Sequence, residues 1–184
     1  MIAKEELNIL WSLEQTAEKY EDRVAVSDVN QELTWKGLVK KAQVIGAELS
    51  KKVQPGNPIP VLLEKSSETL AVMLGIVYAG CFYVPVNPMN PAERLRKIME
   101  KLEPEVIISD EKGKEQLAAV GIGLEEKVIG PETLLPTTGT DLSEEQRSKL
   151  EQIQGQWKET DALYGIFTSG STGTPKAIVV SHGA

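Results

Sequence analysis

The stretch Leu163–Ser181 reads LYGIFTSGSTGTPKAIVVS and places a polar loop between two apolar runs. The runs Tyr164–Phe167 and Ala177–Val180 have the composition of strands, which predicts two strands joined by the loop. Glycine permits backbone angles that other residues resist, so N–H groups of such a loop can converge on an anion. Hydroxyls add donors and Lys176 adds a positive charge, so we predict a phosphate-binding loop. Its candidate residues are Thr168, Ser169, Gly170, Ser171, Thr172, Gly173, Thr174 and Lys176.

Two common phosphate-binding signatures do not fit this loop. In a Walker A loop counted from Gly170, the second glycine would fall at position 175, which is Pro175. The dinucleotide-binding fingerprint also fails, because Gly170 and Gly173 form no G-x-G-x-x-G run and no helical pattern follows them. The alternative is a flexible surface turn rich in Gly, Ser and Thr, with no binding function.

The chain before the loop alternates between short apolar runs and helical patterns. This β-α-β rhythm predicts an α/β fold, a layered sheet of mostly parallel strands with right-handed crossovers and helices on both faces. The run Glu68–Ala79 is apolar nearly all round, with Ser66 or Ser67 as its cap and Gly80 as its stop. We expect helices at 8–20, 35–51, 68–79, 91–102, 112–119 and 143–154, strands at 23–27, 33–35, 61–63, 82–86, 106–109 and 127–129, and a loop at 55–60.

The sequence suggests three parts. Residues 1–135 carry the strand and helix rhythm of one α/β subdomain. Residues 136–160 are polar and charged and are expected to form a surface excursion, with a helix capped by Asp141 or Ser143. Residues 161–184 hold the strand–loop–strand unit, which we expect to begin a second subdomain.

Composition narrows the classes of protein that fit. The 184 residues carry a net charge of −7, which argues against nucleic acid as a partner because phosphate backbones need a basic surface. One cysteine, Cys81, and one histidine allow neither a disulfide framework nor a His/Cys metal cluster, and a reducing cytoplasmic location fits. The uncharged run Leu70–Val86 is interrupted by Gly75, Gly80 and Pro85, so we read a buried helix and strand and no membrane span.

The loop also carries a resemblance to a known family. Together with Asp161-x-Leu163-Tyr164 before it and Ser181-His182 after it, TSGSTGTPK resembles the signature of the adenylate-forming superfamily. That group includes acyl-CoA synthetases, luciferases and the amino-acid-activating adenylation domains of peptide synthetases. One position departs from the family pattern, because Ala177 stands where glycine is usual. The resemblance implies the N-terminal subdomain of an acyl-adenylate synthetase-like fold.

Three earlier segments are similar to motifs of the same superfamily. Tyr20–Ala25 resembles its opening motif with Glu21 in place of proline, and Leu33–Leu38 resembles its first core motif with Trp35 in place of tyrosine. The run Val77–Pro88, followed by Pro91-x-Glu93-Arg94, resembles its second motif. These motifs are expected to be mainly architectural. They make the resemblance extend over nearly the whole chain, slightly closer to amino-acid-activating domains and D-alanine–carrier-protein ligases than to fatty-acyl enzymes.

The resemblance implies the activation of a carboxylate by ATP with Mg²⁺. A small carboxylic or amino acid would attack the α-phosphate, pyrophosphate would leave, and the acyl group would pass to a carrier protein's phosphopantetheine or to coenzyme A. Thr168, Ser169, Ser171 and Thr172 would donate to the β- and γ-phosphates, and Lys176, the candidate catalytic residue, would act electrostatically or fix the loop. His182 is either a base or, as we expect, a packing or substrate-wall residue.

The superfamily continues for several hundred residues beyond the point that matches Ala184, with the adenine, ribose and acid sites. We therefore expect this chain to be an N-terminal portion of the enzyme that folds without turning over. Two alternatives stay open. The first is a non-catalytic nucleotide- or phosphate-binding or interaction module, and the second is an α/β domain with an inert turn.

Overall fold

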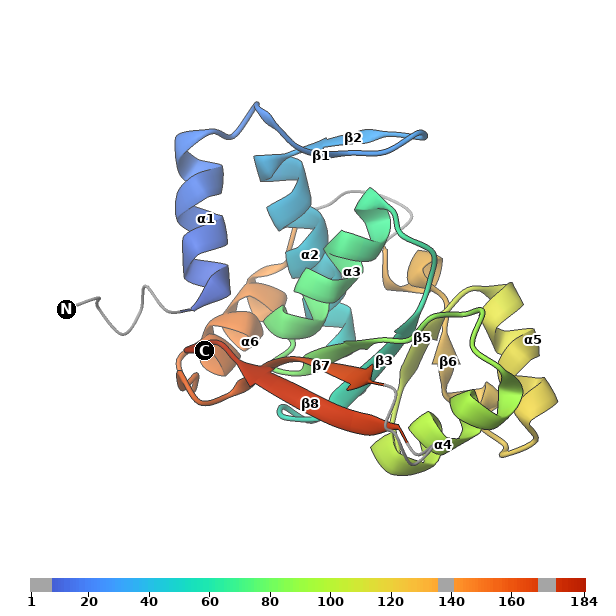
Figure 1. Ribbon diagram of the computed structural model, residues 1–184. Coiled ribbons are helices and arrows are strands. Elements are labelled where there is room, and N and C mark those ends of the chain that lie inside the picture. The colour runs from blue at the N-terminus through green and yellow to red at the C-terminus, as the bar shows by residue number, and fades with distance from the viewer. Residues whose placement is uncertain (1–7, 136–140, 169–174) are drawn as a thin grey trace.

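The computed structural model describes residues 8–135, 141–168 and 175–184. Eight strands and six α-helices are assigned in these ranges, with two short 3₁₀ helices (Figure 1). The helices are α1 (Ile9–Lys19), α2 (Trp35–Leu49), α3 (Ser67–Tyr78), α4 (Ala92–Leu102), α5 (Glu111–Val120) and α6 (Glu144–Gln154). The strands are β1 (Val24–Ser27), β2 (Glu32–Thr34), β3 (Pro58–Leu62), β4 (Phe82–Pro85), β5 (Ile107–Ser109), β6 (Val128–Ile129), β7 (Ala162–Thr168) and β8 (Lys176–Ser181).

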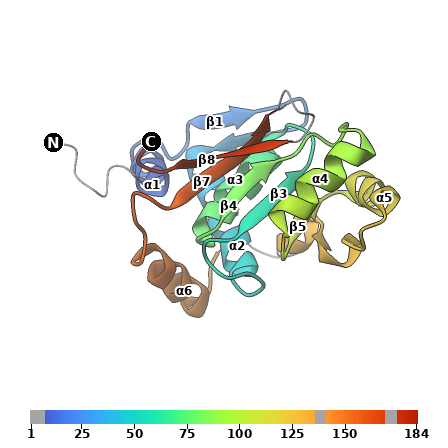
Figure 2. The ribbon, with the colours of Figure 1, turned by 60° about the horizontal axis from the view of Figure 1, so that its bottom comes forward.

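Six of the strands form one sheet in the order β6-β5-β3-β4-β7-β8 (Figure 2). The neighbours from β6 to β7 pair in parallel, and β8 alone runs antiparallel, against β7. The chain passes from β3 to β4 on one side and then crosses to β5 on the other, so right-handed crossovers put α3 and α4 on opposite faces. The predicted α/β class with a mostly parallel sheet is confirmed.

Alternate residues of the central strands belong to two separate hydrophobic cores, one on each face of the sheet. Val61 and Ile108 belong to the cluster under α1, α2 and α3, whereas Leu62 and Ile107 belong to the cluster under α4 and α5. This alternation follows from the two-residue period of a strand. The central strands are thus covered on both faces, which explains why β3 is apolar along its whole length.

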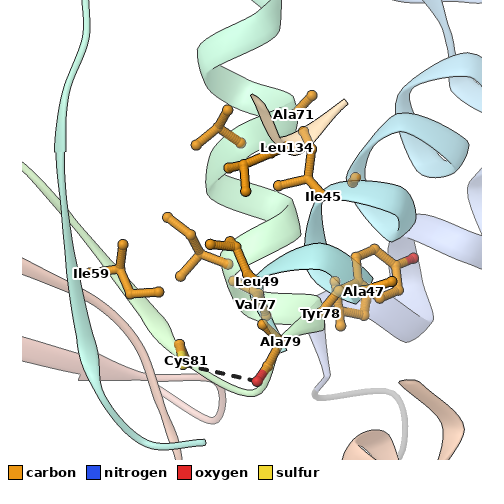
Figure 3. Packing of buried hydrophobic residues seen from close by; sticks show 14 of the residues in the cluster. Ile45, Ala47, Leu49, Ile59, Ala71, Val77, Tyr78, Ala79, Cys81 and Leu134 are labelled. Atoms are coloured by element: carbon orange, nitrogen blue, oxygen red, sulfur yellow. Dashed lines mark hydrogen bonds between the residues drawn. The ribbon is translucent and has the colours of Figure 1, made fainter. Parts of the chain in front are cut away.

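Helices α2 and α3 pack unusually close at the centre of the larger core (Figure 3). A Cβ atom built on Gly46 would lie 2.5 Å from Tyr78 Cβ and 2.9 Å from the Gly75 carbonyl oxygen, so glycine is what allows the helices to touch. The figure labels Ile45, Ala71 and Tyr78 among the side chains of this contact. Cys81 lies in the same core, 2% exposed, and burial raises the pKa of its thiol to about 11.

Most of the predicted boundaries hold within one or two residues. Ser66 caps α3, Gly80 follows that helix with φ +77°, and Ser143 caps α6 through a reciprocal capping box with Gln146. The expected loop at 55–60 is wrong in its second half, because β3 begins at Pro58. Proline is tolerated there since β5 pairs only with the last two residues of β3.

The strand pair β7–β8 joins the same sheet as β3 to β6, whereas β1 and β2 form a separate two-stranded sheet. Tyr83 of β4 pairs with Tyr164 of β7, and their rings stack with centroids 5.9 Å apart. Whether residues 161–184 also begin a second subdomain stays a prediction. In the part of the chain that the structure describes, no helix has the length and apolar character needed to cross a membrane.

Candidate phosphate-binding site

The base of the predicted phosphate loop is formed by the last residue pair of a β-hairpin. Strand β7 ends at Thr168 and β8 begins at Lys176, and these two residues stand opposite each other in the register. Both are exposed, and Pro175 beside them is buried. The other predicted ligands, Ser169, Gly170, Ser171, Thr172, Gly173 and Thr174, lie outside the described residues.

The hairpin mouth lies at the edge of the sheet where its parallel strands end. Strands β3 to β7 run in the same direction, so their carboxyl ends share one edge, and the mouth of the hairpin is at that edge beside α4 (Figures 1 and 2). In open α/β sheets, this is the edge at which ligands bind. The position of the Thr168–Lys176 pair is therefore consistent with the predicted role.

Arg94 of α4 reaches the strand that leads into the loop. Its Nη2 atom donates to the carbonyl oxygen of Phe167 at 3.4 Å, one residue before Thr168. The Phe167 side chain packs against the core under α4. Sequence reasoning placed Arg94 in an architectural motif and missed its contact with β7, because 73 residues separate it from Phe167.

A competing anion site at the same edge is already occupied by the protein itself. The N-terminus of α3 follows β3, but Asp28 from the β1–β2 turn accepts from the Ser67 backbone N–H at 2.7 Å. That bond and those from Asn30 and Gln31 hold the pKa of the Asp28 carboxyl well below its usual range. Because a carboxylate fills this helix end, its N–H groups are not open to another anion.

His182 lies at the opposite edge of the sheet from the loop. It follows the last residue of β8, and six residues of strand separate it from the hairpin mouth by about 20 Å. Its ring meets Trp157 edge-on at 5.4 Å, and its Nδ1 atom lies 3.5 Å from the Ile9 backbone N. Burial lowers the pKa of its imidazole. These contacts favour the packing interpretation, and the ring is too far from the loop for a base there.

His182 also lines a pocket of about 260 Å³ between α1, α6 and the amino ends of β4 and β7. Its wall includes Leu10, Trp157 and Lys158. At the other end of the strands, the loop mouth contributes no residue to it. Among residues 8–135, 141–168 and 175–184, no group of three or more His, Cys, Asp and Glu could hold a metal ion.

Comparisons with known proteins give a family model and relatives for this chain. A family model described as "AMP-binding enzyme" matches residues 13–184. Bacitracin synthase 1 of Bacillus licheniformis is 33% identical over 174 residues, which cover 92% of this chain and 3% of that protein. The chain thus spans only a small part of this relative.

Solved structures share the fold. The N-terminal subdomain of NpsA from Klebsiella oxytoca, in complex with 3-hydroxybenzoyl-AMSN, matches with a TM-score of 0.75 and 22% identity over 95% of this chain and 41% of that one. The nonribosomal peptide synthetase FmoA3, in an AMPPNP-bound form, matches with a TM-score of 0.74 and 24% identity over 96% of this chain and 17% of its own. At these identities the likeness establishes the architecture alone.

Proposed function

Because the chain belongs to the AMP-binding enzyme family, we propose that it is the N-terminal part of a ligase that activates a small carboxylic or amino acid with ATP. One observation carries the proposal. The family model spans 172 of the 184 residues, from 13 to 184, and this range ends in a hairpin that holds Thr168 opposite Lys176 at the ligand-binding edge of the sheet.

The proposed reaction is an attack of the acid's carboxylate on the α-phosphorus of ATP. The bond from that phosphorus to the bridging oxygen breaks, pyrophosphate leaves, and the acyl adenylate remains. Negative charge grows on the pyrophosphate, so the chain's task is to present donors and positive charge to it. We assign the hydroxyl of Thr168 and the loop residues Ser169, Gly170, Ser171, Thr172, Gly173 and Thr174 to the β- and γ-phosphates.

Lys176 is the candidate catalytic residue of this portion. This residue is exposed at the loop mouth, directly across from Thr168 in the register. A lysine there supplies a point charge of the sign that the leaving pyrophosphate needs. The described residues offer no carboxylate cluster for a metal, so Mg²⁺ would be held chiefly by the phosphates, as is common for this ion.

The ligands named for similar structures support the choice of nucleotide and acid. FmoA3 is recorded with AMPPNP, and the NpsA subdomain with 3-hydroxybenzoyl-AMSN. The relative bacitracin synthase 1 suggests an amino acid as the substrate and carrier-protein phosphopantetheine, with coenzyme A as the alternative, as the thiol acceptor. We further propose that the protein works in the cytoplasm, away from membranes and nucleic acids, and that the 184 residues alone do not turn over.

The test is ATP–pyrophosphate exchange over a panel of amino acids and small carboxylic acids. It would compare the product of the complete reading frame with the 184-residue chain, and Lys176→Gln with the matched surface variant Lys149→Gln in α6. We expect exchange by the complete product with one acid, at least a tenfold loss in Lys176→Gln and none in Lys149→Gln. The proposal would be overturned if the complete protein is folded and shows no ATP–pyrophosphate exchange with any acid. If that protein binds Mg-ATP without exchange, the chain belongs to a binding module and not to a ligase.

A further inference from the structure

Strand β7 loses one of its two sheet partners, β4, before it reaches the loop, while β8 stays paired with it as far as Thr168. The β4–β7 ladder is recorded at Tyr83 and Tyr164, and β4 ends at Pro85, which has no N–H to donate. Phe167 lies three residues beyond Tyr164, past the end of this ladder. On its β4 side, Phe167 therefore has no strand residue recorded opposite it, and a carbonyl that points to this side can accept from a side-chain donor.

Helix α4 supplies that donor and also packs against the side chain of the same residue. The half-buried Arg94 guanidinium bonds to the Phe167 carbonyl oxygen at 3.4 Å, and the Phe167 ring packs on the core that contains Leu95 and Ile98. On the same helix, Arg96 is exposed and pairs with Glu93 at 3.7 Å. Arg94 and Arg96 thus face different surroundings two residues apart.

We propose that Arg94 is a positioning residue for the phosphate loop, where its guanidinium holds the Phe167 carbonyl and thereby keeps the Thr168–Lys176 pair in register. The inference rests on the proposed function, because the pair matters only if the loop binds phosphates. Helix α4 then braces the end of the hairpin that β4 does not pair with. The Arg94 guanidinium also places a positive charge next to Phe167, the residue that precedes Thr168 at the loop mouth.

The test measures two quantities separately in the 184-residue chain: the rate of amide exchange in the hairpin and the affinity for the ligand. Amide hydrogen exchange would be followed by NMR at the loop end of the hairpin, Thr168, Lys176 and Ala177, and at its other end, Ala162 and Ser181. Mg-ATP and Mg-tripolyphosphate would be titrated in parallel. The variants are Arg94→Ala, the conservative Arg94→Lys, and Arg96→Ala as the matched control on the same helix.

We expect Arg94→Ala to speed exchange at the loop end about fivefold, the effect of losing one long charge-assisted hydrogen bond, with no change at Ala162 and Ser181. We also expect the dissociation constant of Mg-ATP to rise about fivefold, Arg94→Lys to recover part of both effects, and Arg96→Ala to match the unmodified chain. If Arg94→Ala does not fold, Arg94→Lys decides alone, since its ammonium group cannot reproduce the guanidinium geometry.

The outcomes separate this inference from the proposed function. If Arg94→Ala leaves amide exchange at the loop end unchanged, or changes it equally at both ends of the hairpin, the positioning role is overturned. This holds whatever the dissociation constant of Mg-ATP is. Faster exchange with an unchanged dissociation constant would also overturn it, since the hairpin would then be positioned for no ligand. Faster exchange in a chain that binds neither Mg-ATP nor Mg-tripolyphosphate would support a brace on the hairpin and count against the phosphate site itself.

Discussion

Replacing Gly46 by alanine should destabilise the protein, although alanine is the better helix former. The added Cβ would lie 2.5 Å from Tyr78 Cβ, 2.9 Å from the Gly75 carbonyl oxygen and 3.3 Å from the Ala79 backbone N. Two of these neighbours are backbone atoms and the third is a Cβ, so no side-chain rotation relieves the clash. Helix α2 must instead move away from α3 by about 1 Å to restore ordinary carbon contacts of about 3.5–4 Å.

The expected change in the free energy of unfolding follows from two opposing effects. Overpacking a close-packed core costs about 1–3 kcal/mol, and alanine in place of glycine in a helix returns about 1 kcal/mol. Because the contact here involves backbone, the upper part of the first range applies, and we expect a net loss of about 1–2 kcal/mol in the free energy of unfolding. For a chain of this size, that corresponds to a drop in Tm of about 2–8 °C.

The assay is thermal and urea unfolding followed by circular dichroism. Gly37→Ala in the first turn of the same helix is the matched control, because the nearest atom to its added Cβ is the Thr34 hydroxyl oxygen at 3.3 Å. That variant should match or exceed the Tm of the unmodified protein. A Gly46→Ala chain as stable as the Gly37→Ala chain would refute the reasoning, since α2 and α3 would then not be in backbone contact at this point.

Three further predictions concern buried or capping groups. Tyr78→Phe removes a hydroxyl that donates to Glu14 at 2.8 Å from a fully buried ring, so we expect a loss of about 1 kcal/mol in urea unfolding, and no loss would show that the bond contributes nothing. Burial raises the pKa of Cys81 to about 11, so about one thiol in a thousand is ionised at pH 8, and a disulfide reagent should modify it slowly until urea unfolds the chain. Hydrogen bonds from Ser67, Asn30 and Gln31 lower the pKa of Asp28 below its ordinary 3.8, so Asp28 contributes stability above pH 3.8 that is lost as the pH falls toward its folded-state pKa. The stability difference between the unmodified protein and Asp28→Asn should accordingly stay constant from pH 7 to 5 and shrink below pH 3.8, and a difference independent of pH would contradict the assigned bond.

Local patterns in the sequence predicted the elements well because each depends on neighbouring residues. Ser66 and Ser143 cap helices through bonds to residues three positions away, and Gly80 turns the chain by its own backbone angle. The start of β3 was misjudged because two prolines normally argue against a strand. What permits them is the short reach of β5 along β3, a property of strand pairing that no local pattern records.

The candidate site shows the same division between local and distant causes. Thr168 and Lys176 are eight residues apart, and the patterns around them predicted two strands joined by a loop. That these strands pair as a hairpin with Thr168 opposite Lys176 comes from the structure. His182 is only six residues from Lys176, but an extended strand carries it about 20 Å away to the other edge of the sheet. Arg94 is far away in sequence, yet the crossover through α4 brings it to Phe167. Separation along the chain is therefore a poor guide to this site. An extended strand carries His182 away from the loop mouth, whereas the parallel sheet brings Arg94, from a distant segment, to the edge where β7 ends.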